Sequence, residues 1–134
     1  MSAVLVDTSV LLDVLTDDPE WGAASSAALA EATEVSRLVI NPVIYAEVSV
    51  RFLRIEEVEE ALPSDKFVRE QIPYEAAFLA GKAFLLYRQR GGPRASLLPD
   101  FLIGAHAAIA GYSLLTRDPV RFRSYFPKLV LIAP

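Results

Sequence analysis

Short apolar segments alternate with longer helical segments along the chain, and this alternation is the strongest constraint on the fold. The first segment, residues 3–6, is aliphatic, ends at Asp7 and is followed by a helical pattern. Strands are predicted at residues 3–6, 37–40, 67–72, 113–116 and 129–132, and helices at 10–15, 18–34, 41–53, 55–62, 73–89, 99–110 and from 118 onwards. Strands separated by helices are typical of βαβ units, so we predict an α/β fold around a parallel sheet.

The length of the chain is typical of one domain, and we predict a single domain over residues 1–134. No apolar run approaches the roughly 20 residues of a membrane span. The first residues lack the basic region of a signal peptide. We therefore expect a cytoplasmic protein that does not bind a membrane.

Few side chains of this chain can bind a metal through nitrogen or sulfur. It has no cysteine and one histidine, whereas zinc sites usually need several such ligands. A metal site in this protein must therefore consist mostly of oxygen atoms, which favours Mg²⁺, Mn²⁺ or Ca²⁺.

The net charge of −4 is unevenly distributed along the sequence. Residues 1–75 carry 15 acidic and 5 basic side chains, a net charge of −10. Residues 76–134 carry 8 basic and 2 acidic side chains, a net charge of +6, and the two acids are Asp100 and Asp118. This asymmetry indicates a face that binds a polyanion, although random variation of surface charge would give the same pattern.

Four acidic side chains from distant parts of the sequence are expected at one edge of the sheet. Asp7 directly follows the first strand, and Asp118 lies just beyond the fourth. Asp100 stands at the start of the helix that leads into the fourth strand, and Glu47 lies in the helix after the second. Because the carboxyl ends of parallel strands lie at the same edge, we predict that these carboxylates converge there.

Each of these acids also has an ordinary structural explanation. Three of them suit the N-cap position of a helix, and Glu47 stands four residues before Arg51, which allows an ion pair along one helix. If the acids do converge, their mutual repulsion would drive one of them to protonate unless a divalent cation is bound. Mg²⁺ or Mn²⁺ in such a site can activate a water molecule and stabilise the leaving oxygen of a phosphodiester.

Four segments of the sequence together resemble the PIN domain family. They are residues 4–12 (VLVDTSVLL), 41–47 (NPVIYAE), 99–107 (PDFLIGAHA) and 114–119 (LLTRDP), the last followed by Phe122. They occur in the order and at the spacing of the family and span nearly the whole chain. The small size most resembles the VapC-type toxins of toxin–antitoxin pairs.

The resemblance implies an α/β/α sandwich around a short parallel sheet and a metal-dependent endoribonuclease. It implies that Asp7, Glu47, Asp100 and Asp118 hold Mg²⁺ or Mn²⁺. Water would then attack an RNA phosphodiester in line and leave 5′-phosphate and 3′-hydroxyl ends. It also implies that Thr116 hydrogen-bonds a carboxylate or a metal-bound water, although strand-end bonding explains this hydroxyl equally well. The expected partners are RNA, a second copy of the chain and a VapB-type antitoxin.

The basic residues of the second part of the chain are candidates for RNA binding. His106, which stands among alanines, is expected to pack within its helix rather than act as a catalytic base. Arg121 follows close behind the fourth acid. The predicted contacts to RNA phosphates are Lys82, Arg88, Arg90, Arg94 and Arg117, although solubility and helix-end pairing are alternative roles.

Two other functions remain open from the sequence. A haloacid dehalogenase-like phosphatase would use Asp7 as a nucleophile, but that family has a second Asp two residues later, where this chain has Ser9. Alternatively, the domain is a catalytically silent module that binds RNA or a protein partner. A trapped phosphoaspartate at Asp7 would favour the phosphatase, and failure to bind Mg²⁺ or Mn²⁺ with RNA affinity retained would favour the silent module.

Overall fold

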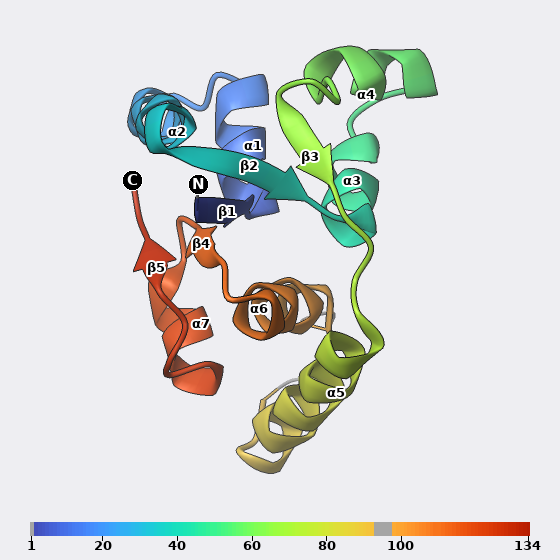
Figure 1. Ribbon diagram of the computed structural model, residues 1–134, viewed down its shortest axis with the longest axis vertical. Coiled ribbons are helices and arrows are strands. Elements are labelled where there is room, and N and C mark those ends of the chain that lie inside the picture. Colours follow the sequence, from blue (N-terminus) through green and yellow to red (C-terminus); the bar gives the residue numbers. More distant parts are fainter. Residues whose placement is uncertain (1, 93–97) are drawn as a thin grey trace.

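Five parallel strands form one sheet in the order β3-β2-β1-β4-β5 (Figure 1). The computed structural model describes residues 2–92 and 98–134. The strands are β1 (Ser2–Val6), β2 (Ser36–Ile40), β3 (Phe67–Arg69), β4 (Ser113–Leu115) and β5 (Leu131–Ile132). The strand order reverses on either side of β1, so the carboxyl ends of β1 and β4 form the switch point at which α/β proteins usually place their sites.

Seven helices of the described residues cover the sheet in two layers, which confirms the predicted α/β/α sandwich. α1 and α2 lie on one face, α6 and α7 lie on the other, and α5 packs on the outside of α6 (Figure 1). α3 contacts both α1 and α6 at the end of the sheet. The helices are α1 (Thr8–Leu15), α2 (Gly22–Val35), α3 (Pro42–Ser49), α4 (Ile55–Ala61), α5 (Tyr74–Gln89), α6 (Leu98–Ala110) and α7 (Pro119–Tyr125).

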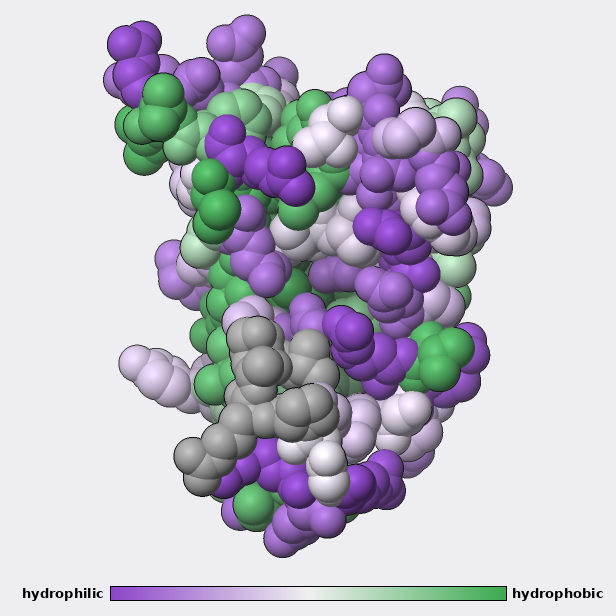
Figure 2. Space-filling view, turned by 180° about the vertical axis from the view of Figure 1, so that it is seen from behind, coloured by the Kyte–Doolittle hydropathy of each residue, from purple (hydrophilic) through white to green (hydrophobic). Residues whose placement is uncertain are grey.

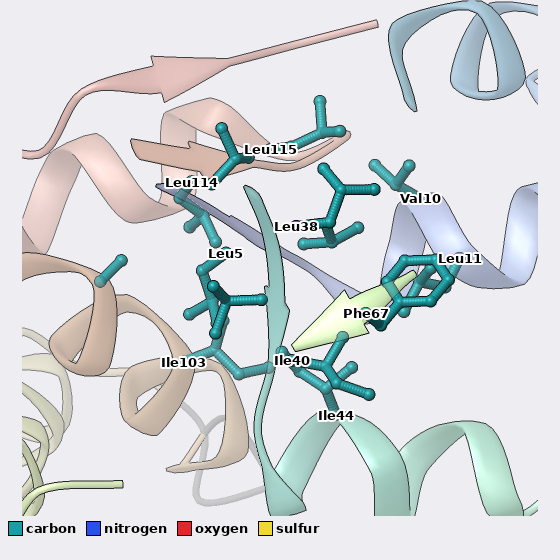
Figure 3. Close-up of a cluster of buried hydrophobic side chains, with 14 of the residues drawn as sticks. Leu5, Val10, Leu11, Leu38, Ile40, Ile44, Phe67, Ile103, Leu114 and Leu115 are labelled. Atoms are coloured by element: carbon teal, nitrogen blue, oxygen red, sulfur yellow. The ribbon is translucent and has the colours of Figure 1, made fainter. Parts of the chain in front are cut away.

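The core is built from aliphatic side chains on both faces of the central strands. Leu5 pairs in register with Val39 and with Leu114, and all three are fully buried. Figure 3 shows Leu5 and Leu114 beside Ile103 of α6. A strand buried on both faces reads as a continuous apolar run, which is why the first strand was visible in the sequence. None of the helices in the described ranges is long and apolar enough to cross a membrane.

Several predicted element boundaries were wrong by a few residues. The second helix begins at Gly22 rather than at residue 18, because the Asp18 carboxylate accepts hydrogen bonds from the backbone N–H groups of Glu20 and Trp21 and closes a turn. The third helix ends at Ser49, four residues early, and the first begins at Thr8, two residues early. The strands predicted at residues 67–72 and 129–132 are shorter, because pairing with the neighbouring strand covers only part of each apolar run.

Two large aromatic side chains of α5 face outward. Tyr74 is 91% exposed and Phe78 is 68% exposed. The fully buried positions of α5 are Ala76, Ala80 and Ala83, and the half-buried rings of Phe84 and Tyr87 pack against Phe101 of α6. α5 therefore packs on α6 through alanines and aromatic rings and leaves Tyr74 and Phe78 at the surface.

Candidate functional site

Asp7 stands at the switch point of the sheet. Its backbone N–H donates to the carbonyl oxygen of Leu115 at 2.9 Å, which joins the ends of β1 and β4. The residue is only 5% exposed. It occupies the N-cap position of α1, but its side chain makes no capping hydrogen bond. Its carboxylate is therefore not used for the structural role that the sequence allowed.

Two hydroxyl groups hold the Asp7 carboxylate in place. Ser9 Oγ and Thr116 Oγ1 both donate to Asp7 Oδ2 at 2.8 Å. Thr116, which is fully buried, also accepts a hydrogen bond from the backbone N–H of Asp118 at 3.0 Å. Both side-chain hydrogen bonds are made to Oδ2, and among the described residues no side-chain donor reaches Oδ1.

The environment of Asp7 disfavours its negative charge. Burial raises the pKa of this carboxyl above its ordinary value of 3.8, and repulsion from Asp100 raises it further. The hydrogen bonds from Ser9 and Thr116 lower the pKa but do not offset the effect of burial. A cation at this position would relieve the cost of keeping the carboxylate ionised.

Asp7, Glu47 and Asp118 all lie near Asp100. Burial raises the pKa of Asp100, repulsion from Glu47 and Asp118 raises it further, and Arg121 opposes the shift. Together with the repulsion between Asp100 and Asp7, these interactions place the other three acids within electrostatic reach of Asp100. The four residues come from four separate elements of the chain, and the fold brings them to one edge of the sheet.

Glu47 and Asp118 do not have the structural roles that their local sequence suggested, which were an ion pair with Arg51 and a helix N-cap. Thr8 Oγ1 donates to Glu47 Oε1 at 2.6 Å, and no ion pair joins Glu47 to Arg51 in the part of the chain that the structure describes. Asp118 precedes α7 at the N-cap position, but its side chain makes no capping hydrogen bond. Glu47 thus pairs with a residue other than the one expected from local sequence, and the Asp118 carboxylate does not serve as a helix cap.

The chemistry of this cluster fits a hard divalent cation, because its donors are carboxylate and hydroxyl oxygens. Within residues 2–92 and 98–134, however, no three acidic or histidine side chains are gathered closely enough to hold one ion. Asp100 Oδ2 instead accepts a hydrogen bond from Arg121 Nη1 at 2.7 Å, and Glu47 is held by Thr8. To hold an ion, the acidic side chains must move closer together, and binding through Asp100 Oδ2 would compete with Arg121.

The predicted RNA-binding residues lie on two parts of the molecule. Arg117 Nε lies 3.0 Å from the buried Asp13 carboxylate, and its guanidinium lies over the ring of Trp21. Three others lie on or next to α5, each with its cationic group over an aromatic ring, and they are Lys82, Arg88 and Arg90. Arg94 lies outside the described residues. An RNA role for all five therefore stays a prediction, and for Arg117 it would compete with a structural one.

His106 is packed inside the protein, as its sequence context indicated. Asn41 Oδ1 accepts the backbone N–H of Ile44, so its Nδ2 is the donor to His106 Nδ1 at 3.0 Å. The other ring nitrogen lies 3.6 Å from Glu70. Burial lowers the pKa of His106, and Glu70 opposes this shift. The histidine thus joins α6 to the start of α3, the two helices that carry Asp100 and Glu47.

Sequence reasoning missed the contact between Arg121 and Asp100. Arg121 stands three residues after Asp118, one turn into α7, and this placed it close to the fourth acid in the sequence. Its partner lies 21 residues earlier on a different helix. The spacing along the sequence shows that Arg121 stands close to Asp118, but it does not show that Arg121 pairs with Asp100.

Comparison with known proteins identifies related sequences and folds. The model of the PIN domain family matches residues 4–125. The fold is similar to that of VapBC2 from Rickettsia felis bound to a DNA fragment of its promoter, with a TM-score of 0.73 and 17% identity over 98% of each chain. It is similar to VapBC-1 from nontypeable Haemophilus influenzae, with a TM-score of 0.72 and 18% identity over 98% of this chain and 97% of that one. FitAcB from Neisseria gonorrhoeae gives a TM-score of 0.70 and 18% identity over 96% of each chain. No curated protein matches the sequence.

Proposed function

Because the chain belongs to the PIN domain family, whose members are generally nucleases, we propose that it is a metal-dependent endoribonuclease and the toxin of a toxin–antitoxin pair. The observation that carries the proposal is that Asp7, Glu47 and Asp118 each lie close enough to Asp100 to interact repulsively with it at the switch point of the sheet. Four carboxylates on four elements have no common structural task, and they supply the ligands that a phosphodiesterase metal site needs.

In this proposal the four acids hold one or two Mg²⁺ or Mn²⁺ ions. A bound ion supplies Lewis acidity and a water of lowered pKa. Ser9 and Thr116 keep the Asp7 carboxylate oriented, and Thr8 does the same for Glu47. The expected products of hydrolysis carry a 5′-phosphate and a 3′-hydroxyl.

The basic end of α5 supports RNA as the substrate. Arg88 and Arg90 are exposed there, and α6, which carries Asp100 in its first turn, begins at Leu98. Only residues 90–97 therefore separate the end of α5 from the helix that carries this acid. Exposed guanidinium groups so placed are suited to bind phosphates beside the acids.

The proposed partners are a VapB-type antitoxin and a second copy of the chain. Similar folds occur in VapBC complexes, two of which are bound to DNA. Exposed apolar residues offer surfaces for such partners, since Val50, Leu53 and Ile55 are each at least 65% exposed around the start of α4. In Figure 2 hydrophobic side chains reach the surface at the upper left, the corner to which α4 belongs. Such clusters on a small domain usually mark protein contacts.

The direct test is cleavage of RNA by matched variants. Total RNA is incubated with the wild type, Asp7→Asn or Asp65→Asn in the presence of Mg²⁺, and new 5′ ends are sequenced. Asp65 is an exposed acid outside the cluster and serves as the control. We expect discrete new ends with the wild type and the control and none with Asp7→Asn or with EDTA. Identical ends from Asp7→Asn, or cleavage that survives EDTA, would refute the proposal.

One observation favours a catalytically silent binding module as the second candidate. Arg121 already neutralises Asp100, and no tight three-ligand group exists among the described residues. Titration calorimetry with Mn²⁺ separates the candidates, because a nuclease must bind the ion and a silent module need not. Absence of Mn²⁺ binding together with intact RNA affinity would favour the silent module.

A further inference from the structure

Arg121 is the counterion of the acid cluster. Among the described residues it is the only basic side chain that forms an ion pair with any of the four acids. Its Nη1 donates to Asp100 Oδ2 at 2.7 Å, which is a short, charge-assisted hydrogen bond. The nearby Arg117 pairs with Asp13 instead. The positive charge that balances the cluster therefore comes from one side chain.

The Arg121 side chain can move away from Asp100. The side chain of Arg121 is 43% exposed, whereas that of Asp100 is 22% exposed. An unbranched side chain at the surface of α7 can change rotamer without repacking the core. Its other guanidinium N–H groups make no hydrogen bond to the described residues, so they are free to bind a second anion.

The contact also occupies one oxygen of Asp100. Asp100 Oδ2 has one lone pair fewer to offer a metal ion while it accepts a hydrogen bond from the Arg121 guanidinium group. Placing a divalent cation beside Arg121 would bring like charges close together at a partly buried site, where electrostatic interactions are strong. Binding of the cation and pairing with Arg121 are thus mutually unfavourable.

We propose that Arg121 and a divalent cation compete for Asp100, and that the guanidinium released by the cation binds an RNA phosphate beside the cluster. The first half concerns only the chain and the metal. The second half rests on the function proposed above. Through this exchange Asp100 would hold the arginine away from RNA in the metal-free protein, and metal binding would make it available.

The first half is tested by titrating Mn²⁺ into the wild type, Arg121→Gln, Arg121→Lys and Arg123→Gln, with free Mn²⁺ followed by electron paramagnetic resonance. Arg123 is exposed on the same helix and forms no ion pair among the described residues, which makes it a matched control. We expect Arg121→Gln to bind Mn²⁺ about tenfold more tightly than the wild type, which is a typical coupling between two sites. Arg123→Gln should bind like the wild type, and Arg121→Lys should restore most of the competition.

The melting temperature of the metal-free protein tests the role of Arg121 as a counterion without any metal present. Without its counterion the cluster repels itself, so metal-free Arg121→Gln should melt at a lower temperature than metal-free Arg123→Gln. If Arg121→Gln binds Mn²⁺ no more tightly than Arg123→Gln, the competition is refuted, whatever the enzyme does to RNA.

The second half is tested with a labelled 2′-O-methyl RNA of mixed sequence, followed by fluorescence anisotropy, and a gel run after each titration checks that the RNA is still intact. Mn²⁺ should increase the RNA affinity of the wild type and of Arg123→Gln, and this gain should be absent from Arg121→Gln. An equal gain in Arg121→Gln would overturn the phosphate contact. A wild type that binds this RNA no better with Mn²⁺ would also overturn it, and the Mn²⁺ titration would still decide the competition.

Discussion

Two hydroxyl donors offset only part of the cost of burying the Asp7 carboxylate. The hydrogen bonds from Ser9 and Thr116 lower its pKa, but burial and repulsion from Asp100 leave the pKa above 3.8. A group whose pKa is raised by folding stabilises the protein most below its unfolded pKa, and this contribution is lost as the pH rises through the folded pKa. Ionisation of Asp7 as the pH rises therefore costs the metal-free protein stability.

We predict that Asp7→Asn melts at a higher temperature than the wild type in EDTA at pH 7.5. A gain of about 1 kcal/mol corresponds to roughly 4 °C for a domain of this size. The gain should shrink as the pH falls through the folded pKa of Asp7, because the wild-type carboxyl then becomes neutral as well. Differential scanning calorimetry between pH 4 and 8 measures both effects.

Mn²⁺ should reverse this order of stability, because a ligand that binds only the folded state stabilises it. The wild type and Asp65→Asn should gain stability from Mn²⁺, and Asp7→Asn should gain little. A melting temperature of Asp7→Asn that lies below that of the wild type in EDTA at all these pH values would contradict a destabilising charge at Asp7.

Close packing around α6 depends on a glycine. A Cβ atom added at Gly104 would lie 2.6 Å from the Phe126 ring and 2.9 Å from the Phe122 ring. Both rings are buried and belong to α7 or its end. Gly104 thus lets α6 approach the segment that carries Arg121. Gly81 in α5 has a different role, since a Cβ added there would meet no atom within 4 Å.

We predict effects of opposite sign for the same substitution in these two helices. Gly104→Ala should destabilise the protein by about 1–3 kcal/mol, because overpacking a core forces side chains off their rotamers. Gly81→Ala should stabilise it by about 0.5–1 kcal/mol, because alanine favours the helix and restricts the unfolded chain. Urea unfolding followed by circular dichroism measures both. A stabilising Gly104→Ala would show that α6 and the two phenylalanine rings can separate at little cost.

At the scale of the whole molecule, the uneven charge of the sequence becomes a spatial feature. The C-terminal part of the chain supplies α5, α6, α7 and β5, and its basic residues outnumber its acids by six. α6 and α7 lie together on one face of the sheet, with α5 outside α6 (Figure 1). We therefore expect a polyanion to approach this side of the molecule despite the net charge of −4.

We predict that the double variant Arg88→Gln/Arg90→Gln binds single-stranded RNA with a weaker salt dependence. Each phosphate contact contributes about −0.7 to the slope of log K against log salt concentration, so the loss of two should reduce the slope by about 1.4. Arg51→Gln/Arg54→Gln removes two exposed arginines from the acidic part of the chain and is the control. Equal slopes for the two double variants would place RNA away from the end of α5.

The sequence by itself determined the order of strands and helices and the identity of the four acids. Both depend on local patterns, since a buried strand such as β1 needs a continuous apolar run and Asp7 must follow its end. The resemblance to the PIN domain family added the α/β/α layering. Element boundaries were less accurate, as at Asp18, because turn closure and strand pairing override local propensity.

Only the tertiary structure decided which partners the side chains meet. Nothing near Asp100 in the sequence identifies Arg121 as its counterion, because the two lie on different helices that pack only in the folded chain. The exposure of Tyr74 and Phe78 has the same cause, since α5 packs on α6 through its alanines and through Phe84 and Tyr87, and this leaves the other two rings in solvent. Pairing and exposure are properties of the packed molecule, and no single segment contains them.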